Sequence, residues 1–254
     1  MKRSGDITDI LNDWEFNPND QVRIVKTGDG REVLQVRQPL GIEQYELDGR
    51  PDGKRPFDEE SILHLLRERL ENHRRVYGSE LGFTIDHEDF LLAQNESLLY
   101  YYRYLVLFQI NDFIRTARDT EHNLLLCELV EKHAESEEDK KELLQYKPYI
   151  LRMHAVSKAM ISLHQQMRSA AKDVLQSAID EIETMQDIDT PAFQFERLRS
   201  LNYLRSTLKQ IADQKISPLD RLKAELEEAI KEENYEKAAE LRDRIRELKY
   251  EPEA

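Results

Sequence analysis

The sequence is poor in cysteine, glycine and proline, and each shortage excludes a class of structure. Its 254 residues include 1 cysteine, 8 glycines and 8 prolines. A lone cysteine, Cys127, excludes a disulfide framework and any zinc site rich in thiolates, and its place in an apolar run indicates a core thiol. So few glycines argue against a sheet-rich chain, because sheets and long loops use glycine at their turns. These shortages together predict a mainly helical protein.

The chain also lacks a long apolar run and an excess of positive charge. The most apolar run, residues 98–110, contains Arg103 and is shorter than the roughly 20 residues that span a bilayer. The first residues have no apolar signal core. The formal net charge of −14 argues against a broad basic face for nucleic acid. We therefore expect a cytoplasmic protein whose partners are proteins, with no membrane contact and with direct nucleic-acid binding unlikely.

The N-terminal part, residues 1–57, predicts a short helix followed by a small antiparallel β-hairpin. Apolar residues at helical spacing between Ile7 and Trp14 indicate the helix, with Asp6 as its cap. Two alternating runs flank the turn Thr27–Gly30, which is typical of a hairpin. A third run, Ile42–Leu47, is a further candidate strand.

From Asp58 onward the sequence has helical periodicity almost to its end. Asp58 is the predicted N-cap of the first helix, and Pro148 predicts a break near the start of a later one. Thr190-Pro191 predicts a helix start with threonine as the cap. The segment 90–110 is apolar nearly all round, which predicts a central position in a bundle. Further helices are expected over residues 113–133, 141–163 and 168–185.

A short pattern occurs three times at predicted turns between helices. In each copy a polar pair precedes a large apolar residue, and alanine follows four positions later. We expect the large residue to anchor the second helix and the alanine to let the first helix approach closely. The pattern resembles the inter-helix turn of tetratricopeptide repeats, so we predict irregular helical hairpins of that kind. The copies are residues 111–117, 165–171 and 233–239.

The predicted fold is therefore mainly α, with four parts. They are an N-terminal cap of helix and β-hairpin (1–57), a tetratricopeptide-like helical body (58–190), a connecting helix (191–216) and an antiparallel helical hairpin (217–254).

Residues 217–254 carry the most specific pattern in the chain. Each of the two predicted helices has one apolar face, and Glu233-Asn234 forms the turn with Tyr235 packed at the corner. The first helix is acidic and the second basic, so their charges pair within the hairpin or with another copy. An isolated two-helix unit buries too little apolar surface to be stable alone. This favours docking on a partner, with packing on the chain's own bundle as the alternative.

These residues resemble the UVR motif, which occurs in the excision-repair proteins UvrB and UvrC, in ClpC-type unfoldases and in activators of protein arginine kinases. The core Tyr-Glu-Lys-Ala-Ala-Glu-Leu-Arg-Asp, residues 235–243, carries the resemblance. It implies docking on another UVR hairpin, either in a partner protein or in a second copy of the chain. The predicted contact residues are Leu222, Leu226, Ile230, Tyr235, Leu241, Arg242 and Ile245.

Two further stretches, residues 40–56 and 145–152, resemble uncharacterised bacterial proteins labelled only as containing a UvrB/UvrC motif. This resemblance implies an architecture and no activity. The predicted function is a non-enzymatic adaptor for protein–protein interaction. The alternatives are an accessory factor of DNA excision repair with weak DNA contact, and a regulator of a ClpC-type unfoldase. An unrecognised enzyme requires a polar pocket in the helical body whose titratable groups have perturbed pKa values.

The sequence offers few candidates for chemistry. It has no Gly-x-x-x-x-Gly-Lys-Ser/Thr phosphate loop, so the helicase engine of UvrB is absent. The histidines are scattered, and His122, His154 and His164 are expected at helix surfaces or boundaries. We therefore predict no catalytic residue, no cofactor and no metal.

One loop, residues 49–56, is a candidate anion site. Its three cations stand among glycines and prolines that can shape a cradle for an anion or an acidic tail. The alternative is a solvated turn that positions the β-hairpin against the helices. The tyrosines of residues 100–104 are expected in the core or lining a groove rather than stacking on bases, because consecutive helical residues point in different directions. The candidate anion-binding residues are Arg50, Lys54 and Arg55.

Overall fold

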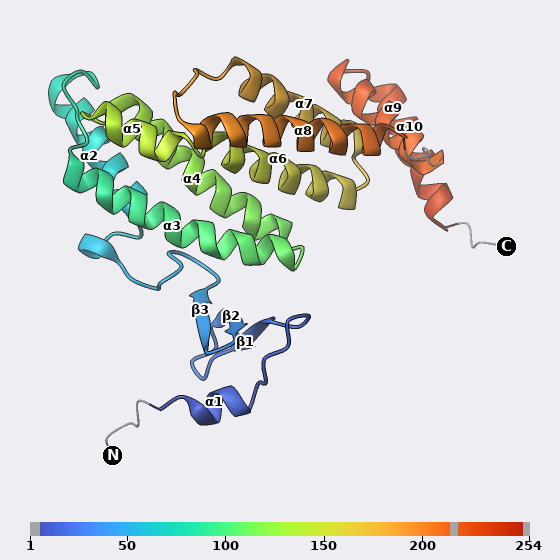
Figure 1. Cartoon of the computed structure of the whole chain (residues 1–254). Coiled ribbons are helices and arrows are strands. Elements are labelled where there is room, and N and C mark those ends of the chain that lie inside the picture. The colour runs from blue at the N-terminus through green and yellow to red at the C-terminus, as the bar shows by residue number, and fades with distance from the viewer. Residues whose placement is uncertain (1–5, 214–217, 251–254) are drawn as a thin grey trace. The chain divides into compact units, whose positions relative to one another are not determined.

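The structure is a computed structural model that describes residues 6–213 and 218–250. Its chain forms two compact units, residues 1–144 and 145–254. The predicted mainly helical fold is confirmed, with a small sheet near the N-terminus and a helical hairpin near the C-terminus (Figure 1). The predicted four-part division stays a prediction, and its helical body, residues 58–190, includes residues of both units.

The sheet of the first unit follows the short helix α1 (Thr8–Asn12). Strands β1 (Val22–Lys26), β2 (Glu32–Gln38) and β3 (Gly41–Glu46) form an antiparallel sheet in the order β1-β2-β3. The predicted hairpin and the third strand are therefore confirmed. Gly30, in the turn between β1 and β2, has φ 89°, a conformation that glycine adopts without steric cost.

Four further helices complete the first unit: α2 (Ile62–Tyr77), α3 (His87–Gln109), α4 (Phe113–His133) and α5 (Glu137–Leu144). The predicted cap of α2 is wrong. Ser61 caps it, because its hydroxyl accepts a hydrogen bond from the His64 amide at 3.0 Å. Asp58 instead lies in a 3-10 turn, Pro56–Asp58, with φ 65°.

Helix α3 is buried on one side only, so the prediction of a central helix buried all round is wrong. Tyr100 and Tyr104 are buried, whereas Leu91, Leu98 and Tyr102 are exposed. Successive residues of a helix point about 100° apart, so an apolar run on a helix can have both buried and exposed members. The buried side packs in part on the sheet, where Leu107 of α3 joins Leu34 and Leu47 in a small apolar core.

A buried arginine joins the sheet to α3 and α4. Arg103 and Asp119 have fully buried side chains that form a two-pronged ion pair, with Nε–Oδ2 2.6 Å and Nη2–Oδ1 2.7 Å. The remaining Nη1 of Arg103 donates to the carbonyl of Glu46 (2.7 Å), the last residue of β3, and to that of Gly49 (2.8 Å) in the loop that follows. The planar guanidinium of Arg103 thus holds α3, α4 and the end of β3 together.

A buried carboxylate makes a second link in this unit. Glu96 of α3 accepts hydrogen bonds from the amides of Ile62 (2.8 Å) and Leu63 (3.0 Å), in the first turn of α2. It also accepts from Arg50 Nη1 (2.9 Å) and pairs with His122 Nε2 (3.0 Å). Burial by itself raises the pKa of the Glu96 carboxyl, but the hydrogen bonds from His122 and the two amides outweigh it and lower the pKa. Glu96 is therefore ionised at neutral pH and stabilises the N-terminus of α2.

The second unit contains α6 (Lys147–His164), α7 (Arg168–Thr184), α8 (Pro191–Asp213), α9 (Pro218–Lys231) and α10 (Tyr235–Tyr250). The break near Pro148 is confirmed, because α6 begins at Lys147 with the proline in its first turn. The Thr190 cap is also confirmed, since its hydroxyl accepts from the Phe193 amide at 3.1 Å. Residue 217, the predicted first residue of the C-terminal hairpin, lies outside the described residues.

The sequence pattern that occurs three times corresponds to three turns of one geometry, between α3 and α4, α6 and α7, and α9 and α10. In each turn a residue other than glycine has positive φ, namely Asn111 (61°), Gln166 (60°) and Glu233 (57°). The amide of the next residue closes a Schellman turn on the preceding helix. These hydrogen bonds run from Asp112 to Leu107 O (2.9 Å), from Met167 to Ser162 O (2.8 Å) and from Asn234 to Ala229 O (2.8 Å).

The structure corrects the alignment of these copies. Gln166 is equivalent to Asn111, whereas the gapless alignment pairs Gln165 with it. The small buried residue in the first turn of each second helix is Thr116, Ala171 or Ala238, and the predicted Ala239 is exposed. A shift of one position turns a side chain by about 100° around the helix, from the buried face to the exposed one.

Candidate protein-docking hairpin

The hairpin of α9 and α10 has a very small core of its own. Ala229 of α9 and Ala238 and Leu241 of α10 are buried against one another, and Leu222 and Leu226 pack beside them. Alanines next to the turn let the two backbones approach closely. So few apolar side chains supply little burial energy, which leaves the hairpin dependent on further contacts.

The turn is built by local chemistry. Glu233 takes the left-handed conformation, and its amide donates to the Ile230 carbonyl at 3.1 Å. Asn234 then caps α10, because its side-chain oxygen accepts from the Lys237 amide at 3.2 Å. The Ala238 amide makes the first backbone bond of α10, to Asn234 O at 3.0 Å. The turn thus forms at Glu233 and Asn234, the two residues predicted for it.

The structure separates the seven predicted contact residues into two groups. Leu241, Leu222 and Leu226 belong to the core of the hairpin itself. Ile230 and Tyr235 lie on either side of the turn and are 43% and 71% exposed. On α10, Arg242 is exposed and Ile245 is half-buried.

The prediction that Tyr235 packs at the corner is therefore wrong. The turn is closed by backbone hydrogen bonds and by the Asn234 cap, so the aromatic ring at the first position of α10 points to solvent. Met167 also has a substantial exposed fraction, whereas Phe113 is buried as predicted. The large apolar residue is thus an anchor in one turn of the three.

Polar contacts join α9 to the neighbouring part of the second unit. Lys231 Nζ lies 3.5 Å from a carboxylate oxygen of Asp173 on α7. Lys223 Nζ donates to the side-chain oxygen of Gln166 in the turn before α7. Both lysines have flexible stems and exposed or half-buried positions, so these contacts orient α9 with modest energy.

The candidate anion loop has a different role in the structure. Arg50 pairs with Asp52 at 2.8 Å and with buried Glu96 at 2.9 Å. Arg55 donates to the Asp58 carbonyl at 3.1 Å, and Lys54 is exposed. The predicted set of three available cations is therefore not formed, because two carboxylates already neutralise Arg50. Its bond to α3 matches the alternative, a turn that positions the sheet against the helices.

The buried polar residues were not predicted from the sequence, although one signal for them is present. Arg103 stands inside the most apolar run of the chain, and a charge in such a run requires a buried partner. Pattern alone does not say that the partner is Asp119. His122 was expected at a helix surface, but its side chain is largely buried against Glu96. Cys127 is buried, as predicted.

Residues 6–213 and 218–250 contain neither a helix suited to a membrane nor a cluster of side chains suited to a metal ion. None of the helices in these ranges is both long and apolar enough to cross a membrane. Within the same ranges, no three histidine, cysteine, aspartate or glutamate side chains are grouped to bind a metal ion.

Comparison with known proteins identifies the hairpin. The family model for the UvrB/uvrC motif, called UVR, matches residues 217–251, which contain α9 and α10. The C-terminal element is thus a UVR hairpin, as the sequence pattern indicated. No curated protein and no solved structure matches the chain.

Proposed function

We propose that this protein is a non-enzymatic adaptor that docks through its UVR hairpin. The partner is a protein that carries a UVR hairpin, or a second copy of this chain. The observation that supports the proposal is the exposure of Ile230 and Tyr235 beside the turn of a UVR hairpin with a minimal core. An aromatic and an aliphatic side chain exposed together are typical of the anchor of a protein interface.

The energetics favour a paired hairpin over an isolated one. Complete burial of a large apolar side chain contributes about 1.5–3 kcal/mol, so docking that covers Ile230 and Tyr235 adds several kcal/mol. A second hairpin of the same kind supplies equivalent side chains on its own surface. In a two-fold arrangement the same patch of both hairpins forms the interface, so each contact occurs twice, as in isologous interfaces.

Charge supports the same arrangement. Glu225 and Glu228 of α9 are exposed, as is Glu232 just after it, and Arg242 and Arg244 of α10 are exposed. When two hairpins pair with α9 of one beside α10 of the other, opposite charges meet at the rim. Rim charges contribute more to orientation and to association rate than to affinity.

The experiment compares two tyrosines of equal exposure in the full chain. Tyr235 is 71% exposed and Tyr77, on α2, is 70% exposed. Self-association is measured by light scattering, and binding is measured to purified proteins with UVR hairpins of the UvrB, UvrC and ClpC types. Tyr235→Ala is expected to weaken the association at least about tenfold, as expected for an interface anchor, whereas Tyr77→Ala leaves it unchanged.

A second pair of variants controls for shape. Ile230→Ala and Ile24→Ala remove the same atoms from side chains that are 43% and 44% exposed. The first is expected to weaken docking and the second to have no effect. The proposal fails if the hairpin variants associate as the unaltered chain does. It also fails if the chain neither self-associates nor binds any of the three UVR proteins.

A further inference from the structure

Helix α8 carries an apolar hollow that the docking function does not use. One side of α8 packs on α6 and α7, and the opposite side, which we call its outer face, has large apolar side chains at the surface. Phe195 is 62% exposed and Leu198 is 63% exposed. Exposed apolar side chains gathered in one place mark a surface that binds another molecule. The hollow has a volume of about 500 Å³, and its lining residues are Phe195, Leu198, Arg199, Asn202 and Tyr203.

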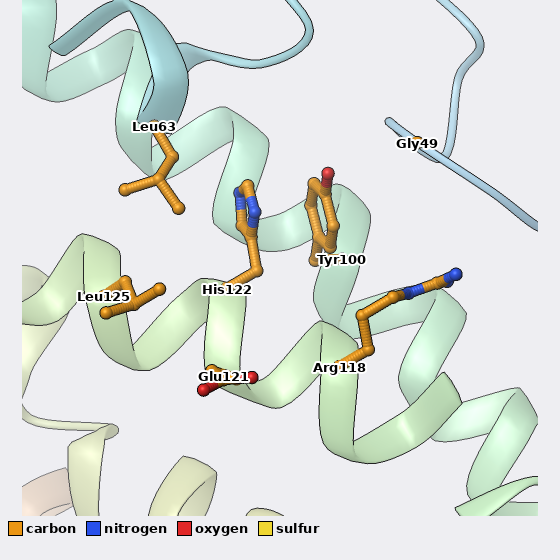
Figure 2. Close-up of a pocket in the computed structure, with 7 residues that line it drawn as sticks. All are labelled: Gly49, Leu63, Tyr100, Arg118, Glu121, His122 and Leu125. Atoms are coloured by element: carbon orange, nitrogen blue, oxygen red, sulfur yellow. The ribbon is translucent and has the colours of Figure 1, made fainter. Parts of the chain in front are cut away.

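This hollow differs from the one drawn in Figure 2, which lies in the first unit. In that hollow the polar side chains already have partners within the chain. His122 pairs with Glu96, and the guanidinium of Arg118 donates to Asp48 and Asp119. The hollow on α8 is largely apolar instead, so apolar contact is what it offers to a partner.

The spacing of the residues on the outer face favours an α-helix as the partner. Phe195, Leu198 and Asn202 follow one another at intervals of three and four residues, so they lie in one row along α8. A second helix that packs along such a row contacts it at each turn. An extended peptide that adds a strand needs a free sheet edge, which a helix face does not provide.

The charges of the outer face indicate which kind of helix fits. Between residues 191 and 212 the exposed charged residues of α8 are all basic, namely Arg199, Arg205 and Lys209. Arg199 and Arg205 are six residues apart and point about 120° apart, so they lie on either side of the apolar row. Arg205 also pairs with Glu183 of α7, but both side chains are exposed and such a pair is weak. The face is thus basic in a chain whose net charge is −14.

The remaining acidic residue beside the outer face neutralises it only in part. The carboxylate of Glu196 lies 3.4 Å from Arg199 and 4.0 Å from Arg152, a buried residue of α6, so one negative charge is shared by two arginines. Lys209 has no ion pair with a residue that the structure describes. Positive charge therefore remains for the carboxylates of a partner.

We propose that the outer face of α8 binds an acidic amphipathic helix of a partner protein. The apolar stripe of that helix covers Phe195, Leu198 and Tyr203, and acidic residues on both sides of the stripe meet the three basic residues of the face. The α8 of a second copy does not fit, because its outer face is basic as well. The site shares no residue with the UVR hairpin and does not depend on the docking proposed for it.

The test uses two synthetic helical peptides, each about 18 residues or five turns long. Both carry leucine along one face, and the first has glutamate on either side of the leucines where the second has lysine. Each peptide is labelled with a fluorophore and titrated with the full-length protein, and its anisotropy is followed. We expect saturable binding of the acidic peptide, at least about tenfold tighter than that of the basic peptide and weaker at high salt.

Variants of exposed residues locate the binding on α8. Leu198→Ala is expected to weaken binding of the acidic peptide about tenfold, as for a central apolar contact. Arg199→Gln is expected to weaken it about threefold, the effect of one exposed ion pair. The matched controls Leu81→Ala and Arg67→Gln change exposed residues of the same types in the first unit and should leave the binding unchanged.

A further variant, Tyr235→Ala, separates this site from the UVR hairpin and should bind the acidic peptide as the unaltered protein does. The proposal is overturned if Tyr235→Ala removes the binding, if the basic peptide binds as tightly as the acidic one, or if Leu198→Ala binds as tightly as its control. It is also overturned if binding of the acidic peptide does not saturate. Binding to phosphatidylserine vesicles that Leu198→Ala abolishes would overturn it too, because the face would then contact a membrane.

Discussion

Replacement of Glu96 by glutamine tests the central polar link of the first unit. The carboxylate joins α3 to the first turn of α2, to Arg50 in the loop after β3 and to His122 on α4. Glutamine has nearly the same shape but offers one acceptor oxygen and an NH2 donor group. In Glu96→Gln the NH2 group therefore faces other donors, and the Arg50 charge loses its buried partner.

The magnitude follows from these four contacts. Hydrogen bonds to a charged group contribute about 1.5–3 kcal/mol each, and breaking a buried ion pair by removal of one partner costs about 3–5 kcal/mol. Glutamine retains one or two of the contacts from the α2 amides. We therefore expect Glu96→Gln to lower the free energy of unfolding of the first unit by about 3–5 kcal/mol, a large part of the about 5–15 kcal/mol typical of a domain.

The pH dependence gives the prediction a second observable. The pKa of Glu96 is lowered in the folded chain from its ordinary value of 4.5. Its contribution is thus fully present above pH 4.5 and is lost as the pH falls through the folded-state pKa. The stability difference between the unaltered protein and Glu96→Gln should therefore shrink below pH 4.5.

The assay is urea unfolding at several pH values, with hydrogen exchange at Ile62 and Leu63 to locate the effect in α2. Glu128→Gln, at an exposed position, is the control and should change stability by less than about 0.5 kcal/mol. A loss below about 1 kcal/mol for Glu96→Gln would refute the assigned role, because neutral hydrogen bonds alone account for so small a value. So would a stability difference that does not change between neutral and acidic pH.

Three further predictions test other buried and turn positions. Arg103→Met should destabilise the first unit by about 3–5 kcal/mol, because it leaves the buried charge of Asp119 unpaired. The double variant Arg103→Met with Asp119→Leu should recover most of this loss. Urea unfolding of both variants measures the difference. Gly53→Ala should lower the free energy of unfolding by about 1–2 kcal/mol, because Gly53 has φ 69° and the added Cβ lies 3.1 Å from Glu46 Cγ. The control Gly28→Ala has open space around the added Cβ and should be close to neutral in the same assay. Gln166→Gly should raise the stability by up to about 1 kcal/mol, since glycine relieves the left-handed conformation at φ 60°, and an unchanged or lower Tm would contradict this account of the turn.

Much of the secondary structure was predictable because its signals are local. Helix α4 was predicted over residues 113–133, and the structure has it over Phe113–His133. The helix start at Thr190-Pro191 and the hairpin around residues 27–30 also follow from nearby residues. Caps, prolines and turn glycines act on their immediate neighbours, so one stretch of sequence is enough to read them.

The burial of individual side chains was less predictable. Tyr235 was expected inside a corner and is exposed, and Arg50, a candidate residue for an anion site, pairs with Glu96. The three related turns were found, but the middle copy was aligned one residue off. Each of these features depends on which face of an element meets another element, and the pattern of a single segment does not contain that information.

The sequence by itself determined the UVR hairpin, because the match lies in one continuous segment, residues 217–251, whose turn and apolar stripes are local features. It also determined the helical class and most helix boundaries, through periodicity and capping. Only the tertiary structure decided that Leu241 fills the core of the hairpin while Ile230 and Tyr235 face solvent. Only the tertiary structure brought Glu96 to His122, because ionic partners far apart in the chain are selected by the packing of whole elements against one another.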